Sequence, residues 1–421
     1  MIQKAVDAAK PGDTVLVTNG VYQTGGTGDT QVRVTKPLAL RSVNGPGVTV
    51  IDGLKARRCA YLGTNTVLSG FTLTKGNADH GGGVLCEASG VVTNCVITSN
   101  VAFVGGGAYG GTLYGCTLPG NTAWYWGGGA YGGTLHNCTV TGNAASGSGG
   151  GACDATLHNC ILAANLAGNM GGGTGGGALG GTFYNCTVTG NSSWGRAVVG
   201  GVSDATLYNC IVSSNECGNY NERCAFSFSC TTPRPAGVGN ITNAPLFLDS
   251  AGGNFRLQAN SPCINAGNNA YITNTTDLDG RPRIVGGTVD FGAYEFQPGI
   301  SGAFIAWLRQ YGLPTDGSVD ATDADADGLN NWQEWRCLTD PTNALSVLRL
   351  LALEFSGNNV SVRWQSLAGV SYFLERSADL AATPRFMPLA TNLPGQSNTT
   401  SYTDTNPARL SSLFYRVSVG Q

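Results

Sequence analysis

A cysteine followed five residues later by an asparagine recurs along the middle of the chain at intervals of about 22 residues. A glycine cluster such as Gly127-Gly128-Gly129 precedes each pair. A unit this short and this regular can bury an apolar side only by stacking on its neighbours, so the repeat predicts a solenoid. The pairs are Cys95 and Asn100, Cys116 and Asn121, Cys138 and Asn143, Cys160 and Asn165, Cys186 and Asn191, and Cys210 and Asn215.

Within one unit the residues alternate as in a half-buried strand: Cys138 and Val140 are interleaved with Thr139 and Thr141. The unit is too short for a helical hairpin or a four-stranded blade, and it fits one coil of a parallel β-helix with coils about 4.8 Å apart. Asn137 tolerates the left-handed bend that such a coil needs, and stacked amide side chains can hydrogen-bond between coils. We expect the repeated cysteines to pack inside as thiols, because parallel inward side chains suit a disulfide poorly.

These coils resemble the right-handed parallel β-helix repeats of the pectin-lyase-like superfamily, over roughly residues 1–245 including a short N-terminal capping helix. The resemblance implies a mainly β protein. The superfamily includes lyases, hydrolases, adhesins and structural fibres, so this fold leaves the function open.

Charge and hydropathy exclude some partners. Lys and Arg number 23 against 26 Asp and Glu, a formal net charge of −3, which argues against nucleic acid. No run of 18 apolar residues predicts a transmembrane segment. The first residues do not have the apolar core of a signal peptide, so we expect any export signal to be absent from this chain.

Catalytic candidates in the repeat region are few. Asp154 and Asp204 occupy the same position two coils apart, which predicts a separation of roughly 10 Å, near the upper limit for inverting glycosidases. Arg196 is the base nearby. These three residues are weak candidates, because a solvated turn residue in a glycine position is the simpler interpretation of each acid.

An aromatic or histidine residue stands directly before most of the Asn-Cys pairs, and we predict that these side chains form an outward aromatic strip. Flat rings suit sugar faces and partner proteins, and mutual stacking that only covers the coils is the alternative. Two histidines without a nearby acid make a poor metal site. The strip comprises Tyr114, His136, His158, Tyr184 and Tyr208, joined by Tyr109, Trp124, Trp126 and Tyr131.

The sequence changes character after Asn240. The motifs Asp277-Leu-Asp-Gly-Arg and Asp290-Phe-Gly-Ala-Tyr-Glu resemble the choice-of-anchor Q region of bacterial surface proteins, which implies secretion to the envelope. We expect residues 246–298 to cap the open end of the solenoid. Residues 299–345 predict a helix, a loop and a second helix, and 346–421 predict a small β-sandwich similar to C-terminal modules of secreted bacterial proteins.

The segment Asp323–Glu334 matches an EF-hand calcium loop, which supplies oxygens from positions 1, 3, 5, 7, 9 and 12 and has glycine at position 6. It resembles a dockerin or EF-hand half-site. A single copy predicts a structural calcium at the joint before the sandwich, with Trp332 and Trp335 packed on the helix that contains Trp307. The predicted ligands are Asp323, Asp325, Asp327, the carbonyl of Leu329, Asn331 and Glu334.

Together these features predict a secreted or surface-displayed binding scaffold that contacts polysaccharide or another cell-surface glycan through the outer face of the β-helix. One alternative is a polysaccharide lyase or glycoside hydrolase. Another is a structural subunit that self-associates end to end, since a β-helix offers unpaired strand edges.

Overall fold

The computed structural model describes residues 1–168, 172–194, 199–285, 287–297, 302–315, 319, 322–357, 359–378, 386–405 and 413–419. The chain divides into two compact units. The first comprises Met1–Phe247 and Phe255–Pro298, and the second comprises Leu248–Asn254 and Gly299–Gln421.

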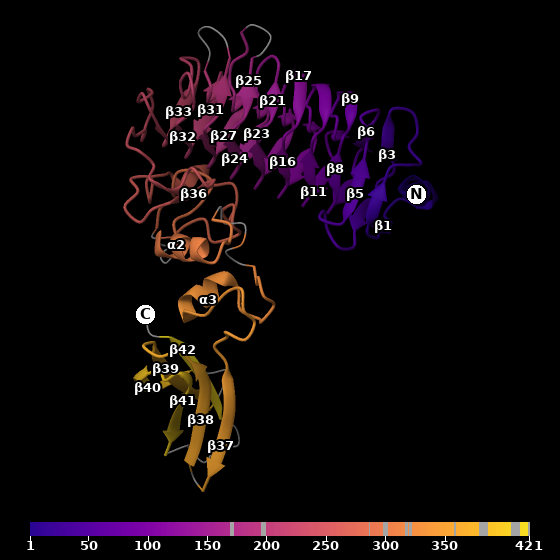
Figure 1. Cartoon of the computed structure of the whole chain (residues 1–421). Helices are drawn as coiled ribbons and strands as arrows, with labels where there is room; N and C mark the ends of the chain where they lie inside the picture. The colour runs from indigo at the N-terminus through magenta and orange to yellow at the C-terminus, as the bar shows by residue number, and fades with distance from the viewer. Residues whose placement is uncertain are drawn as a thin grey trace. The chain divides into compact units, whose positions relative to one another are not determined.

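The first unit is a parallel β-helix, as the repeat predicts (Figure 1). Strands of successive coils pair in parallel and in register, for example Leu113 with Leu135 and Leu135 with Leu157. Along a full coil the chain passes through sheets A, B, D and C in that order.

Across the part of the chain that the structure describes, sheets A and B each contain ten strands. Sheet A comprises β1 (Thr14–Val17), β4 (Ala39–Ser42), β7 (Val67–Ser69), β11 (Val91–Thr93), β15 (Thr112–Tyr114), β19 (Thr134–His136), β23 (Thr156–His158), β27 (Thr182–Tyr184), β31 (Thr206–Tyr208) and β33 (Ala225–Ser227). Sheet B comprises β2 (Gly20–Tyr22), β5 (Thr49–Asp52), β8 (Thr72–Thr74), β12 (Val96–Thr98), β16 (Thr117–Pro119), β20 (Thr139–Thr141), β24 (Ile161–Ala163), β28 (Thr187–Thr189), β32 (Ile211–Ser213) and β34 (Cys230–Thr231).

Sheets C and D are shorter. Sheet C comprises β3 (Thr30–Val34), β6 (Arg58–Leu62), β10 (Val84–Cys86), β14 (Ala108–Tyr109), β18 (Ala130–Tyr131), β22 (Ala152–Cys153), β26 (Ala178–Leu179) and β30 (Val202–Ser203). Sheet D comprises β9 (Asn77–His80), β13 (Val101–Val104), β17 (Thr122–Trp126), β21 (Ala144–Ala145), β25 (Leu166–Ala167) and β29 (Ser192–Ser193).

The repeated cysteines form a buried column of free thiols beside the inward leucines. Each Sγ donates to backbone carbonyls, as Cys138 does to His136 at 3.3 Å. Burial raises the pKa of Cys95 and Cys138, so these thiols stay protonated and unreactive. The expectation of packed thiols is confirmed.

The asparagines that follow the cysteines form a second buried column. Asn143 is fully buried, and its Oδ1 accepts from the backbone N (2.8 Å) and Nδ2 (3.0 Å) of Asn121. Its Nδ2 donates to Leu118 O at 2.8 Å and to Asn165 Oδ1 at 3.0 Å. This pattern repeats through the column, so each amide fastens its coil to both neighbours. The predicted ladder is confirmed.

The glycine clusters lie where the chain turns from sheet D into sheet C. A Cβ built on Gly107 or Gly129 would approach the carbonyl oxygen of the equivalent glycine in the next coil to 2.5 Å. Stacked backbones leave no room for a side chain there, which explains why the clusters recur at the repeat spacing.

The helix α1 (Ile2–Ala8) covers the first coil, with Ile2 and Val6 buried. At the other end of the unit, Asn240 accepts from the backbone N of Ser229, and Ile241 pairs with Cys230. The chain itself therefore covers the first coil and pairs with part of the last one.

We call residues 255–297 the flank segment, because they pack along the side of the coils and not across the open end as we expected. Ile161 and Ile211 stand on sheet B where neighbouring coils have Thr139 and Thr187, and this change creates an apolar outer surface. Residues including Phe291, Ala293 and Tyr294 cover it. The flank segment contains η1 (Asn269–Tyr271), and the short strands β35 (Phe247–Asp249) and β36 (Asn254–Leu257) lie at or before its start.

In its described residues, the second unit contains two helices and two antiparallel sheets. The helices are α2 (Gly302–Gln310) and α3 (Asn331–Cys337), and Trp332 and Trp335 of α3 pack on Phe304 of α2 with ring centroids 5.3 Å apart in both pairs. The sheets share a core that includes Trp364 and Tyr372, as the predicted sandwich requires. They comprise β37 (Leu350–Ser356), β38 (Asn359–Ser366) and β41 (Asn398–Asp404), and β40 (Met387–Pro394), β39 (Ser371–Ser377) and β42 (Phe414–Val419).

Among the described residues, no helix has the length and apolar character needed to cross a membrane.

Candidate functional site

An open groove of about 810 Å³ lies on the outer face of sheet A. Parallel pairing places one residue of each coil in a single row, so Arg41, Ser69, Thr93, Tyr114 and His136 follow one another from β4 to β19. The flank segment contributes one wall. The lining residues are Arg41, Ser69, Thr93, Asn94, Tyr114, Gly115, His136, Asn137, Thr273, Asn274, Thr275 and Thr276.

The same row continues beyond the groove as a column of stacked rings. Tyr114, His136, His158, Tyr184 and Tyr208 have successive centroid distances of 4.7, 4.5, 4.9 and 5.2 Å. Tyr271 of the flank segment stacks on Tyr208 at 4.4 Å. Tyr114 is 45% exposed, whereas His158 is 8% exposed, so the column offers a free ring at its groove end.

Bend asparagines hold the flank segment over the covered part of this column. Asn137, Asn159, Asn185 and Asn209 all have φ between 51° and 53°, the left-handed conformation predicted for the bend. Asn159 Nδ2 donates to Thr276 O at 2.8 Å, and Asn209 Nδ2 donates to Asn268 O at 3.0 Å. The repeat therefore supplies evenly spaced amides to which an irregular segment docks.

Both stacked histidines are neutral at pH 7, and His136 lines the groove. Burial lowers the pKa of His136, and burial together with the adjacent His136 lowers the pKa of His158 to about 4. The Nδ1 of His158 lies 2.7 Å from Thr273 Oγ1. The imidazoles are stacked with only 7° between their planes, whereas a metal ligand points its nitrogen at the ion within the ring plane. This geometry does not favour one ion shared by both rings.

A buried network of charged side chains supports the groove wall that the flank segment forms. Arg283 is 1% exposed; its Nη1 donates to Ala293 O at 3.0 Å, and its backbone N donates to Thr275 O at 3.0 Å. Asp277, Asp290 and Glu295 surround this guanidinium and accept backbone N–H groups of the flank segment. Burial and the nearby Asp290 raise the pKa of Glu295 to about 7. The charged residues of the two motifs thus stabilise a flank segment that has little regular secondary structure.

The remaining predicted rings lie on other faces, so the expectation of one aromatic strip is wrong in its extent. Tyr109 and Tyr131 stack on sheet C with centroids 5.3 Å apart, while Trp124 and Trp126 lie on β17 of sheet D. The glycine turn between these sheets directs the residues before and after it to different faces of the coil.

The acids considered for catalysis lie outside the groove. Asp154 and Asp204 are exposed turn residues between sheets C and A, with φ of 50° and 56°. Asp204 accepts from Asn221 Nδ2 at 2.7 Å and pairs with Arg223 at 3.4 Å. Arg196 lies outside the described residues.

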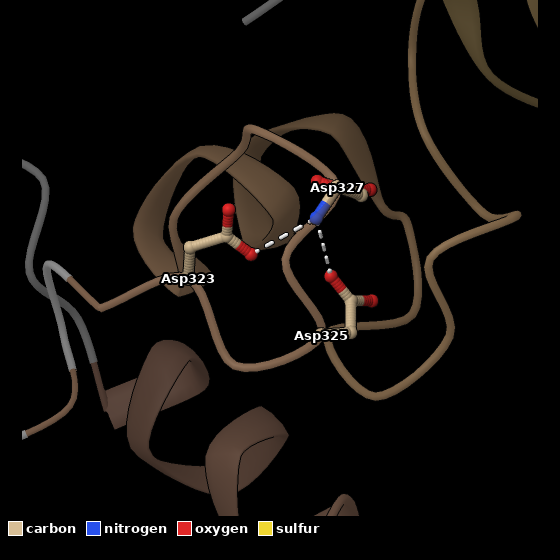
Figure 2. Close-up of side chains that lie close together, drawn as sticks. All are labelled: Asp323, Asp325 and Asp327. Atoms are coloured by element: carbon tan, nitrogen blue, oxygen red, sulfur yellow. Dashed lines mark hydrogen bonds between the residues drawn. The ribbon is translucent and has the colours of Figure 1, made fainter.

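The second candidate site is the loop before α3 (Figure 2). One carboxylate oxygen from each of Asp323, Asp325 and Asp327 lies within 4.8 Å of the others. The three side chains also accept backbone N–H groups of the loop, such as Gly328 N at 2.9 Å from Asp323 Oδ2. Gly328 has a φ of 99°, which suits the predicted turn. The helix α3 begins at Asn331, as expected.

Four buried oxygens at this loop have no hydrogen-bond partner: Asp325 Oδ2, Asp327 Oδ2, Asn331 Oδ1 and Glu334 Oε2. Burial and the charges of Asp325 and Asp327 raise the pKa of Glu334 to about 7. Oxygens that are shielded from water and have no hydrogen-bond partner are costly unless a cation binds them, and calcium prefers such hard oxygen ligands. The residues present therefore fit the predicted ion.

Sequence reasoning missed Arg41, Tyr271 and Thr273–Thr276. Arg41 could have been found by extending the Tyr114 row back through the weaker coils, since Val67-Leu68-Ser69 aligns with the cysteine unit. The flank residues follow no period, and no sequence signal places them on the row.

No protein-family model matches the chain, and no curated protein matches it. Among solved structures, a crystal structure of pectate lyase Pel9A is similar with a TM-score of 0.46 and 17% identity. The match covers 70% of this chain and 90% of that one.

Proposed function

We propose that the protein is a binding scaffold that holds a polysaccharide chain in the groove on sheet A. The observation that carries this proposal is the groove itself, long and open, with the exposed ring of Tyr114 in a row of hydroxyl and amide side chains. A sugar ring can stack its C–H face on the phenol ring, and hydroxyl groups can bond to Thr93, Asn94 and Asn274. Such a glycan lies outside the cell, so a secreted or surface location is part of the proposal.

Arg41 adds a positive charge to one end of the row. Of the described residues that line the groove, none carries a carboxylate, so the groove offers no acid pair for glycoside hydrolysis. Binding is therefore favoured over hydrolysis, and β-elimination on a uronic acid chain is the cleavage reaction that the binding test should also monitor. End-to-end assembly has less support, since α1 covers the first coil.

Replacing Tyr114 with alanine should weaken polysaccharide binding about tenfold, because one stacking ring is lost. A panel of neutral and uronic acid polysaccharides would be tested for retention and for new reducing or unsaturated ends. The melting temperature should not change, since the ring is 45% exposed. Tyr131→Ala, a stacked tyrosine on sheet C, is the matched control. Wild-type affinity in the Tyr114 variant would contradict the proposed site.

We also propose that the loop Asp323–Glu334 binds one calcium ion and thereby holds α2 and α3 together. Asp323, Asp325, Asp327, Asn331 and Glu334 would provide side-chain oxygens, and Leu329 its carbonyl. The four unpartnered buried oxygens support this assignment.

Calorimetric titration of the whole chain should show one calcium site that disappears in Asp325→Ala and persists in Glu354→Ala, a change to an exposed acid outside the loop. Without calcium, ionisation of Glu334 should destabilise the helix pair as the pH rises from about 4.5 through 7, since its folded pKa is raised. Calcium binds the ionised form, so its stabilising effect should be larger at pH 7.5 than at pH 5. Limited proteolysis at residues 322–345 would report both trends. Absence of binding at millimolar calcium would refute the assignment.

A further inference from the structure

The strongest feature outside the groove is a group of exposed rings on sheet D. Phe103, Trp124 and Tyr125 are each 50% exposed, and Trp126 is 44% exposed. Phe103 and Tyr125 are stacked with centroids 5.9 Å apart, and Tyr125 contacts Trp126 at 5.8 Å. We call these four residues the aromatic platform.

A β-bulge produces this exposure. Ala102 pairs with Ala123 and Val104 with Trp126, so β17 has one extra residue opposite Phe103. In a regular strand, alternate side chains point to opposite faces, and one of three consecutive rings would turn inward. The extra residue leaves Trp124, Tyr125 and Trp126 all exposed. Bulges of this kind commonly redirect side chains at functional sites.

The surroundings of the platform indicate the chemistry of its ligand. The exposed residues of β9, β13 and β17 are, besides the four rings, the polar residues Asn77, Asp79, His80 and Thr122. The register places Asp79 beside Phe103, and His80 touches Tyr109 with centroids 5.0 Å apart. Among the described residues of these strands there is no Lys or Arg, and the carboxylate of Asp79 disfavours an anionic ligand.

We propose that the aromatic platform is a second carbohydrate-binding site, specific for uncharged polysaccharides. Sugar C–H faces stack on the exposed rings, and hydroxyl groups bond to Asp79, Asn77 and Thr122. Sheets A and D are not neighbours in the coil, whose order is A, B, D, C, so this site is separate from the groove. Asp79 favours neutral chains on the platform, whereas Arg41 admits acidic chains to the groove.

The test measures binding of the full chain to a soluble β-glucan, a xylan and polygalacturonate by affinity electrophoresis. The double variant Trp124→Ala/Tyr125→Ala should bind a neutral polymer at least about tenfold more weakly, with an unchanged melting temperature. Tyr131→Ala should leave that binding intact, because Tyr131 lies on sheet C and outside the platform. Asp79→Lys should add retention on polygalacturonate that the double variant removes.

Three results would overturn the proposal: failure of the wild-type chain to bind either neutral polymer, equal binding by the double variant, or loss of neutral binding in Tyr131→Ala alone. Phosphatidylcholine vesicles provide a further arm, and ring-dependent binding to them without glycan binding would assign the platform to lipid instead. The groove proposal depends on Tyr114 and Arg41, so each site can fail without the other.

Discussion

Replacing Asn143 with leucine should lower the free energy of unfolding by about 3 kcal/mol or more. Leucine has a similar size but no amide, so the backbone N and Nδ2 of Asn121 lose an acceptor, and Leu118 O and Asn165 Oδ1 lose a donor. Each buried polar group left without a partner costs about 1–3 kcal/mol. Denaturant unfolding followed by circular dichroism would measure the loss.

Thr141→Ala is the control, since Thr141 belongs to the same coil and is only partly buried. It should change stability by less than about 0.5 kcal/mol. Equal stability of the Asn143 variant and the wild-type chain would show that the amide column does not hold the coils together.

Replacing Arg283 with methionine should release the flank segment from the coils. The guanidinium is the buried cation beside Asp277, Asp290 and Glu295, and removal of one side of a buried charge network costs about 3–5 kcal/mol. Hydrogen exchange at residues 268–297 should accelerate, while the interior strands of the coils stay protected. Because Thr273–Thr276 form the groove wall, polysaccharide retention should fall even though Tyr114 and Arg41 are unchanged.

Arg281→Met tests whether charge alone explains that result, because Arg281 lies two residues away and is only partly buried. It should leave exchange and retention near the wild-type values. Unaltered exchange in the Arg283 variant would mean that the apolar contacts of Ile161 and Ile211 suffice to hold the segment.

The coils could be predicted because every repeat has the same residue types at the same positions. Cys138 is small and apolar, Asn143 bridges coils, and Gly129 sits where a Cβ would meet the next backbone. Because the same packing and hydrogen-bonding requirements recur at a fixed spacing, stacked parallel coils are the structure that satisfies all of them. The approach of Asp323, Asp325 and Asp327 could be predicted in the same way, since local spacing sets their geometry, and calcium binding by this loop stays a proposal.

Only part of the groove could be predicted, because one of its walls comes from residues outside the repeat. Tyr114 and His136 belong to the repeat, but the wall comes from Thr273–Thr276, which are far away in sequence and held by single hydrogen bonds to Asn137 and Asn159. The exposure of the rings in this row could not be predicted from the sequence either. His158 and Tyr114 occupy equivalent positions, and only the flank segment makes one buried and the other free.

The thiol column is buried only in the folded chain, so oxidation of these cysteines depends on whether folding or the oxidant acts first. Once folded, all cysteines except Cys217, Cys224 and Cys337 are buried, and an oxidant has almost nothing to attack. Before folding, every thiol is accessible, and a disulfide formed then between two repeated cysteines would join residues that the coils must keep as separate, parallel neighbours. Stacking of the coils therefore has to be faster than oxidation, and a refolding yield that rises with added reductant would be the signature of that competition.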